Sequence, residues 1–351
     1  MVSRTLRSAS DLVQAGLQAD GERGTAEEVA SRYAIAITPA MAELIQREGP
    51  DGAIGRQFIP SASELVAGPG ERPDPIGDEA HTPLPGVVHR YPDRVLLKLV
   101  HTCPVYCRFC FRREMVGPGK VHALDGEALA AALAYVRERP EIFEVILTGG
   151  DPFVLSPRRI ANVTTAIAAI PHVAVLRWHT RVPVVEPEAV SGELVAALTT
   201  GGKVVAVAIH ANHPDEITGK AEAAIARLAG AGLLLLSQTV LLKGINDDAS
   251  VLEALMRAFV RNRVKPYYLH HPDLAPGTGH FRLSIAEGRT IYEALVTRLS
   301  GLCRPAYVLD IPGGYGKVPV ASAHVTRAGE GSYLLRDYAG GVHPYPPIRD
   351  E

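Results

Sequence analysis

The chain has 351 residues and a mass of 37.5 kDa, with 47% hydrophobic and 21% charged residues, a balance that is ordinary for a globular enzyme. Its formal net charge of −2 and pI near 6.7 exclude attraction through global charge, so we expect neither a nucleic-acid nor a membrane partner. Three of its four cysteines are clustered, which argues against a disulfide framework and predicts a reduced, cytoplasmic protein.

The first part of the chain is predicted to be helical. Helix-forming residues dominate residues 1–60, most clearly in TAEEVASRYAI and TPAMAELIQREG, and no apolar run typical of a secretory signal precedes them. Residues 66–92 are rich in proline and glycine, which predicts a connector along a surface. The longest apolar stretch, 228–242, is interrupted by glycines and polar residues and is too short to span a membrane.

From Arg94 onward, short apolar runs alternate with amphipathic windows. The predicted strands are 95–100, 144–150, 173–178, 203–210, 233–238, 264–270 and 306–310. The predicted helices between or after them are 125–140, 156–171, 191–200, 219–232, 249–263 and 285–301. Six strand–helix units and a seventh strand predict a parallel α/β fold, either a full or partial barrel or a doubly wound open sheet.

Candidate functional residues follow the ends of these predicted strands. They are Cys103, Gly149 to Asp151, His210, Asp273 and Asp310. Because parallel strands end at one edge of a sheet, we expect these side chains to share one site. After the last predicted strand, the segment 332–347 could form a hairpin around Ala339–Gly341.

The stretch HTCPVYCRFCFRR places Cys103, Cys107 and Cys110 in a C-x3-C-x2-C spacing. A structural zinc ion takes four protein ligands, which here would require His101 or the distant Cys303. A [4Fe-4S] cluster held by three cysteines leaves one iron open to a cofactor or substrate. The spacing therefore favours such a cluster over zinc or over reduced packing cysteines.

A second unusual stretch is DIPGGYGKVPV, which combines close glycines with Lys317. A lysine at a barrel mouth can form a Schiff base with an aldehyde, of which pyridoxal 5'-phosphate (PLP) is the usual example. Arg90 and Arg94 of HRYPDR are candidate phosphate ligands, and Tyr91 could contact the ring. Taken alone, the loop is typical of a solvated turn and HRYPDR of a surface salt-bridge cluster.

The motif CPVYCRFC resembles the signature of the radical S-adenosyl-L-methionine (SAM) enzymes. In that superfamily SAM binds the open iron and is cleaved to a 5′-deoxyadenosyl radical, and the implied fold is a partial (β/α)6 barrel. TGGDPF resembles the glycine-rich turn that contacts SAM, which implies this role for Gly149, Gly150 and Asp151. His210 and Gln238, at the ends of two other predicted strands, are further candidates for contact with SAM.

Seven segments occur in the order expected for the lysine 2,3-aminomutase family, which the chain resembles over about 87–320. They are HRYPDRVLL, HTCPVYCRFCFRR, TGGDPF, HANHPDEIT, SQTVLLKGIND, KPYYLHHPDLAPGTGHFR and DIPGGYGKVPV. The resemblance implies a PLP-dependent isomerase that moves the α-amino group of L-lysine to the β-carbon. It also implies a reductant such as flavodoxin or ferredoxin, and it leaves open a homo-oligomer.

The same resemblance implies roles for individual residues. The three clustered cysteines would ligate the [4Fe-4S] cluster, Lys317 would hold PLP, and Arg90, Tyr91 and Arg94 would belong to the PLP pocket. Arg112 matches the position that binds the substrate carboxylate, a task that suits a guanidinium fork. Asp273 and Asp310 match the two acidic positions that receive the distal ammonium group of lysine.

Departures from the family pattern leave more than one function open. Catabolic members carry a longer C-terminal region with zinc-binding cysteines, whereas here only Cys303 lies outside the motif, and Tyr315 stands where the family usually has glycine. The short form is similar to the branch that makes (R)-β-lysine for elongation factor P. An aminomutase for arginine or glutamate, a radical SAM enzyme that modifies a protein and a zinc-binding interaction module also stay open. The expected domains are a helical extension and connector (1–90), the barrel (91–320) and the tail (321–351).

Overall fold

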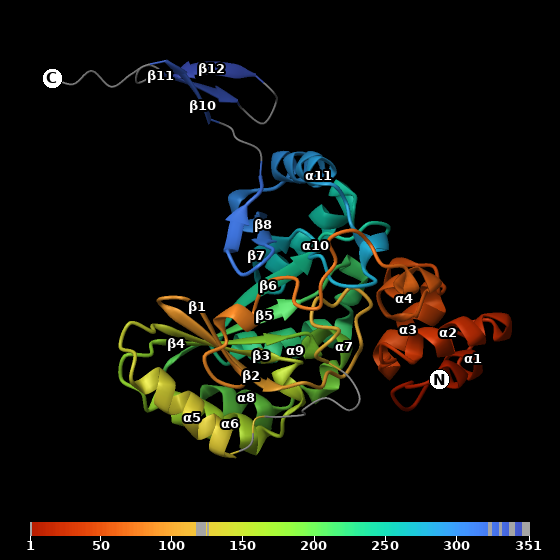
Figure 1. Cartoon of the computed structure of the whole chain (residues 1–351), viewed down its shortest axis with the longest axis horizontal. Helices are drawn as coiled ribbons and strands as arrows, with labels where there is room; N and C mark the ends of the chain where they lie inside the picture. The colour runs from red at the N-terminus through yellow and green to blue at the C-terminus, as the bar shows by residue number, and fades with distance from the viewer. Residues whose placement is uncertain are drawn as a thin grey trace.

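A computed structural model describes residues 2–116, 124, 126–321, 325–329, 332–336 and 341–345. The chain begins with four short helices that pack together beside the rest of the molecule, drawn in red and orange in Figure 1. They are α1 (Ala9–Gln14), α2 (Arg23–Ala30), α3 (Pro39–Glu48) and α4 (Ala53–Phe58). At the start of α3 the Thr38 hydroxyl accepts a hydrogen bond from the Met41 amide, and Pro39 occupies the first turn, where it needs no donor.

Within the described residues, nine strands form one sheet in the order β1-β2-β3-β4-β5-β6-β7-β8-β9. Strands β2 to β8 are parallel to one another, while β1 pairs with β2 and β9 pairs with β8 in antiparallel fashion. The strands are β1 (Val87–Tyr91), β2 (Arg94–Val100), β3 (Glu144–Gly149), β4 (Val175–Thr180), β5 (Val204–His210), β6 (Leu234–Val240), β7 (Lys265–His270), β8 (Ala306–Ile311) and β9 (Gly316–Pro319). The seven predicted strands correspond to β2–β8, so the predicted α/β barrel is confirmed. The doubly wound open sheet is wrong, because the strand order never reverses.

Helices follow the parallel strands and cover the outer face of the curved sheet (Figure 1). They are α5 (Gly126–Arg137), α6 (Pro157–Ala168), α7 (Val182–Val185), α8 (Gly192–Thr199), α9 (Gly219–Gly230), α10 (Ala249–Arg261) and α11 (Ile285–Arg298). Single 3-10 turns join the elements: η1 (Asp20–Glu22), η2 (Ala62–Leu65), η3 (Glu79–His81), η4 (Pro152–Val154), η5 (Pro187–Ala189), η6 (Pro214–Glu216), η7 (Gly279–Phe281) and η8 (Gly301–Cys303). The Ser156 side chain caps α6, and the Asp248 side chain caps α10.

The alternation of side chains along the strands separates a helix-facing core from an inner cavity. In β5, Val205, Val207 and Ile209 are buried in the hydrophobic core, while the intervening Ala208 and His210 line the cavity. Trp178 of β4, the only tryptophan of the chain, is fully buried in the core and serves packing.

The barrel is nearly closed by contacts at its open seam, between β1 and β9. The Lys317 amide donates a hydrogen bond of 2.8 Å to the Tyr91 hydroxyl, which joins the two edge strands without a ladder. The proline- and glycine-rich connector also crosses here, since His81 Nε2 lies 2.8 Å from the Gly314 carbonyl oxygen. A Cβ on Gly77, whose φ is +70°, would come within 2.2 Å of the Gly314 nitrogen, so glycine is required at this crossing.

Neither edge strand is predicted by the sequence. Strand β1 lies inside the segment interpreted as a connector, and β9 inside the glycine-rich loop that carries Lys317. Farther along, β10 (Val325–Gly329), β11 (Ser332–Arg336) and β12 (Val342–Tyr345) form a small antiparallel sheet set apart from the barrel (Figure 1). The turn residues 337–340 of the expected hairpin lie outside the described residues. Among the residues that the structure describes, no helix is long and apolar enough to cross a membrane.

Candidate active site

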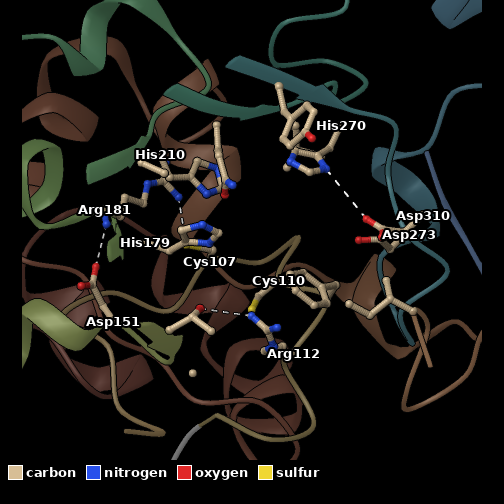
Figure 2. Close-up of a pocket in the computed structure, with 18 of the residues that line it drawn as sticks. Cys107, Cys110, Arg112, Asp151, His179, Arg181, His210, His270, Asp273 and Asp310 are labelled. Atoms are coloured by element: carbon tan, nitrogen blue, oxygen red, sulfur yellow. Dashed lines mark hydrogen bonds and ion pairs between the residues drawn. The ribbon is translucent and has the colours of Figure 1, made fainter. Parts of the chain in front are cut away.

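One cavity of about 280 Å³ occupies the barrel mouth, at the carboxyl ends of the parallel strands. Figure 2 shows that its labelled side chains come from widely separated strands and loops and point toward a shared space. All of the predicted site residues line this cavity: Arg90, Tyr91, Arg94, Cys103, Cys107, Cys110, Arg112, Gly149, Gly150, Asp151, His210, Gln238, Asp273, Asp310 and Lys317. The structure thus brings the sequence-predicted residues together.

The three clustered cysteines lie in the loop that follows β2. A turn closes the loop, in which the Cys110 amide donates to the Cys107 carbonyl oxygen at 3.1 Å, and burial raises the pKa of all three thiols. Within the described part of the chain, no three His, Cys, Asp or Glu side chains converge on one metal-ion position. A zinc ion would need a fourth protein ligand beside these thiols, whereas a [4Fe-4S] cluster can be held by three cysteines, so the residues of the loop fit the cluster better.

The fourth cysteine belongs to another part of the barrel. Cys303 ends η8, just before the amino-terminal end of β8, whereas the cysteine loop follows the carboxyl end of β2. Parallel strands present these two ends at opposite edges of the sheet. The zinc site completed by Cys303, one of the possibilities left by the sequence, is therefore wrong.

The glycine-rich turn after β3 packs directly against the cysteine loop. A Cβ on Gly150 would come within 2.2 Å of the Thr102 carbonyl oxygen, so the two backbones touch. The Asp151 amide donates to the same oxygen at 2.9 Å. The Asp151 carboxylate accepts hydrogen bonds from the Thr180 hydroxyl at 2.7 Å and the Arg181 amide at 2.7 Å, so it fixes the turn to the end of β4.

The arginines of the cysteine loop have two different environments. Arg108 and Arg113 are buried and both form ion pairs with the buried Glu64 of η2, and Arg108 Nη1 also donates to the Ala34 carbonyl oxygen at 2.7 Å. Burial alone would raise the pKa of Glu64, but the two guanidinium groups lower it overall. These two arginines therefore attach the loop to the amino-terminal helices, and Arg112 alone faces the cavity.

Arg112 is paired with a carboxylate that the sequence analysis missed. Its Nη2 lies 3.2 Å from Oδ2 of the buried Asp78, which also contacts Arg90 at 3.2 Å and Lys98 at 3.6 Å. Burial would raise the pKa of Asp78, but Arg112, Lys98 and Arg90 lower it overall. One carboxylate thus faces three cations, and this end of the cavity keeps an excess of positive charge that suits anionic groups.

At the other end of the cavity, Lys317 and two carboxyl groups lie together. Asp310 and Lys317 are cross-strand partners in the β8–β9 pair, and Lys317 Nζ lies 2.8 Å and 2.9 Å from the two Asp310 oxygens. Asp273 and Asp310 are neighbours in the cavity (Figure 2). Burial first, and then the charge of Asp310, raises the pKa of Asp273 to about 7.

The three candidate residues of HRYPDR, which are Arg90, Tyr91 and Arg94, differ in their contacts. Arg90 donates to the Ile76 carbonyl oxygen at 2.8 Å and lies 3.8 Å from Asp310, whereas the Arg94 guanidinium stacks 3.8 Å from the centre of the Tyr91 ring. A cation in this position is attracted by the negative face of the ring. The surface salt-bridge interpretation does not hold for Arg90, which is largely buried, while Arg94 does pair with the exposed Asp93 at 2.7 Å.

His210 and Gln238 stand side by side, because they are paired in the β5–β6 register. His210 Nε2 lies 3.0 Å from the Asn212 amide oxygen, and its ring approaches Phe109 of the cysteine loop. Burial lowers the pKa of His210 to about 3, so the imidazole is neutral at physiological pH. A neutral histidine and an amide offer hydrogen bonds without adding charge beside the thiols.

Sequence reasoning missed three polar residues of the inner face, two in β4 and one directly after it. Arg177, His179 and Arg181 all line the cavity, although an isolated histidine such as His179 is more often structural. The signal is present: these residues recur at every second position, with the apolar Leu176 and Trp178, which flank Arg177, on the other face. Asp78 and Glu64 show no comparable pattern, because Asp78 reaches the cavity from the connector and Glu64 contacts the cysteine loop from η2.

Comparison with known proteins agrees with this arrangement. Residues 97–255 match the model of the radical SAM superfamily. The chain is 39% identical over 311 residues to L-lysine 2,3-aminomutase of Acetoanaerobium sticklandii, covering 89% of this chain and 75% of the relative. It is 37% identical to L-lysine 2,3-aminomutase of Clostridium subterminale, covering 94% and 78% respectively. Glutamate 2,3-aminomutase of Clostridioides difficile is 34% identical, with 92% of this chain and 75% of the relative covered.

Proposed function

Because the chain belongs to the radical SAM aminomutase family of lysine and glutamate 2,3-aminomutases, we propose that it converts L-lysine to β-lysine with the help of PLP. Membership of this family implies a [4Fe-4S] cluster and SAM. When bound, the cluster and SAM supply a radical that removes hydrogen, and PLP supplies a carbonyl carbon and a conjugated ring that delocalises the unpaired electron.

One observation carries the choice of lysine: the two ends of the cavity have opposite chemistry. Arg112 lies at the end with excess positive charge, and Asp273 and Asp310 form an acidic pair at the other. An α-carboxylate suits the first end, and a distal ammonium suits the second. The distal group of glutamate would meet two carboxyl groups instead, which is unfavourable.

The contacts support the residue roles that we propose. Cys103, Cys107 and Cys110 hold the cluster, and the turn of Gly149, Gly150 and Asp151 approaches it closely enough to contact SAM, with His210 and Gln238 beside it. Lys317 binds PLP. Arg90 and Arg94 provide positive charge for the phosphate, and Tyr91 positions Lys317 through the backbone hydrogen bond of 2.8 Å.

Asp310 has two tasks in this proposal. Before PLP binds, it neutralises the Lys317 ammonium, with oxygens 2.8 Å and 2.9 Å from Nζ. PLP held by Lys317 would remove that ammonium from Asp310, and the carboxylate would then be available to the distal ammonium of an incoming substrate. Arg112 meanwhile fixes the α-carboxylate, so the amino acid is held at both ends and its β-carbon has a defined position.

The proposal is tested with anaerobically reconstituted protein, SAM, PLP and dithionite, offering lysine, arginine, glutamate and alanine separately. We expect β-lysine from lysine and little product from the other three, with a reaction lacking SAM as control. Faster formation of β-glutamate would overturn the assignment of lysine. Failure to produce any β-amino acid, although 5′-deoxyadenosine is formed, would overturn the aminomutase proposal.

A further inference from the structure

Arg181, which follows β4, contacts one of the three clustered thiols. Its Nη1 donates a hydrogen bond of 2.9 Å to Sγ of Cys107, and the interaction is drawn in Figure 2. The guanidinium is buried, and its Nη2 donates to Gln57 Oε1 at 2.6 Å and to Glu216 Oε2 at 2.7 Å. The side chain therefore connects a thiol with one buried carboxylate and one buried amide.

The partners of Arg181 are themselves fixed. Glu216 accepts hydrogen bonds from the amides of Asn212 and His213, both at 2.9 Å, and from Gln57 Nε2 at 3.0 Å. Asn212 Nδ2 also donates to Gln57 Oε1 at 3.0 Å. Gln57 belongs to α4, so the network runs from the amino-terminal helices through the end of β5 to the cysteine loop. These hydrogen bonds to Nη1 and Nη2 hold the guanidinium in one position within the buried network.

A donor at a cluster thiolate changes the electron affinity of the cluster. Hydrogen bonds to the sulfur ligands, net charge and exposure to solvent set the potential of iron–sulfur centres. A charged N–H donor stabilises the more negative, reduced form most, because the interaction strengthens with the negative charge on sulfur. A buried guanidinium beside a ligand sulfur should therefore make the cluster easier to reduce, and a nearby carboxylate should oppose this effect.

We propose that Arg181 is a positioning residue that raises the reduction potential of the cluster bound at Cys107, and that Glu216 limits this rise by neutralising the guanidinium. The inference rests on the proposed role of Cys107 as a cluster ligand. It adds a function for the network that the amino-terminal helices complete, since Gln57 contacts both members of the ion pair.

The experiment measures the midpoint potential of the reconstituted cluster by electron paramagnetic resonance, together with iron and sulfide content. Arg181→Met should lower the potential by at least about 59 mV, which corresponds to a tenfold change in a one-electron equilibrium. Glu216→Gln keeps the shape of the side chain and should raise the potential, because it leaves the guanidinium charge uncompensated. The midpoint potential of the double variant should lie between those of Arg181→Met and the unaltered protein, because the double variant loses the hydrogen bond but leaves no unpaired carboxylate.

Glu188→Gln is the matched control, because Glu188 forms an exposed ion pair with Lys220 at 2.8 Å, away from the cavity. It should not change the potential. Full cluster content with unchanged potentials in Arg181→Met and Glu216→Gln would overturn the inference, and so would shifts of the same sign in both. If the Arg181→Met variant does not bind iron, the Glu216→Gln variant tests the inference: a higher midpoint potential supports it, and a lower one overturns it. Absence of a cluster from the unaltered protein would instead contradict the proposed function itself.

Discussion

The two ends of the cavity are built in different ways. At the cluster end, the three thiols come from one loop of eight residues, Cys103 to Cys110, and contacts from Glu64 and Arg181 hold that loop in place. At the amino-acid end, where we propose that the distal group of the substrate binds, Asp273, Asp310 and Lys317 come from a loop and two strands. The first end carries its chemistry in a contiguous motif, whereas the second exists only when the sheet has formed.

This difference makes the amino-acid end depend on strand register. Asp310 and Lys317 face each other because β8 and β9 pair with Leu309 opposite Val318 and Ile311 opposite Gly316. A shift of β9 by one residue would turn Lys317 to the opposite face of the sheet from Asp310. The cluster end has no such dependence, because turn geometry within one loop sets the spacing of its thiols.

The sharpest test of the comparison removes one group from each end. Cys110→Ser should lose iron and all SAM cleavage, because three thiolates are required to hold the cluster. Lys317→Ala should lose aminomutase activity and the visible absorption of bound PLP, yet keep its iron and still form 5′-deoxyadenosine. Iron content and 5′-deoxyadenosine yield are measured for both variants. If Lys317→Ala also loses its iron, the two ends do not act separately.

A smaller effect is expected when the acidic pair is altered. Asp310→Asn should weaken lysine binding roughly 10- to 100-fold, since a hydrogen bond to a charged group contributes about 1.5–3 kcal/mol. The dissociation constant is measured with the PLP-loaded protein. L-norleucine, which has no distal ammonium, is the matched ligand and should bind the variant and the unaltered protein equally. Equal weakening of both ligands would show that Asp310 supports the fold of this end and not the recognition of the ammonium.

The smallest effect is a dependence of lysine binding on pH. Burial and Asp310 raise the pKa of Asp273 to about 7, so the carboxyl group is neutral below that pH and anionic above it. A cationic substrate prefers the anion, and affinity for lysine should therefore rise about tenfold between pH 6 and 8 and then level off. Asp273→Asn should remove this dependence. A dependence of the same size in that variant would assign the titration to another group.

The sequence predicted the parts of the molecule that have periodic or contiguous signals. Apolar runs and amphipathic windows indicated β2–β8 and their helices, and the cysteine motif identified the cluster end. It also placed Asp310 at the end of a strand, and β8 does end one residue later, at Ile311. The edge strands β1 and β9 were missed because HRYPDR and the glycine-rich loop are dominated by turn-forming residues, and only pairing to the rest of the sheet makes them strands.

Residues that act across long distances in the chain were missed for another reason. Glu64 completes a local capping pattern with Ser61, whose amide donates to it at 2.9 Å, so its sequence context indicates only a helix start. Its ion pairs with Arg108 and Arg113 form only because the folded chain places η2 beside the cysteine loop. Asp78 likewise lies in a segment with no strand or helix period, and its role becomes visible only beside Arg112.

The ion pairs of Glu64 also determine how small a fragment of the chain can be and still fold on its own. A fragment limited to the segment that matches the superfamily, 97–255, would contain Arg108 and Arg113 but not their shared carboxylate. A buried charge that loses its partner costs about 3–5 kcal/mol, a large fraction of the stability of a typical domain. We therefore expect the fragment 97–255 to be much less stable than the full chain, and the segment that carries Glu64 to unfold together with the barrel.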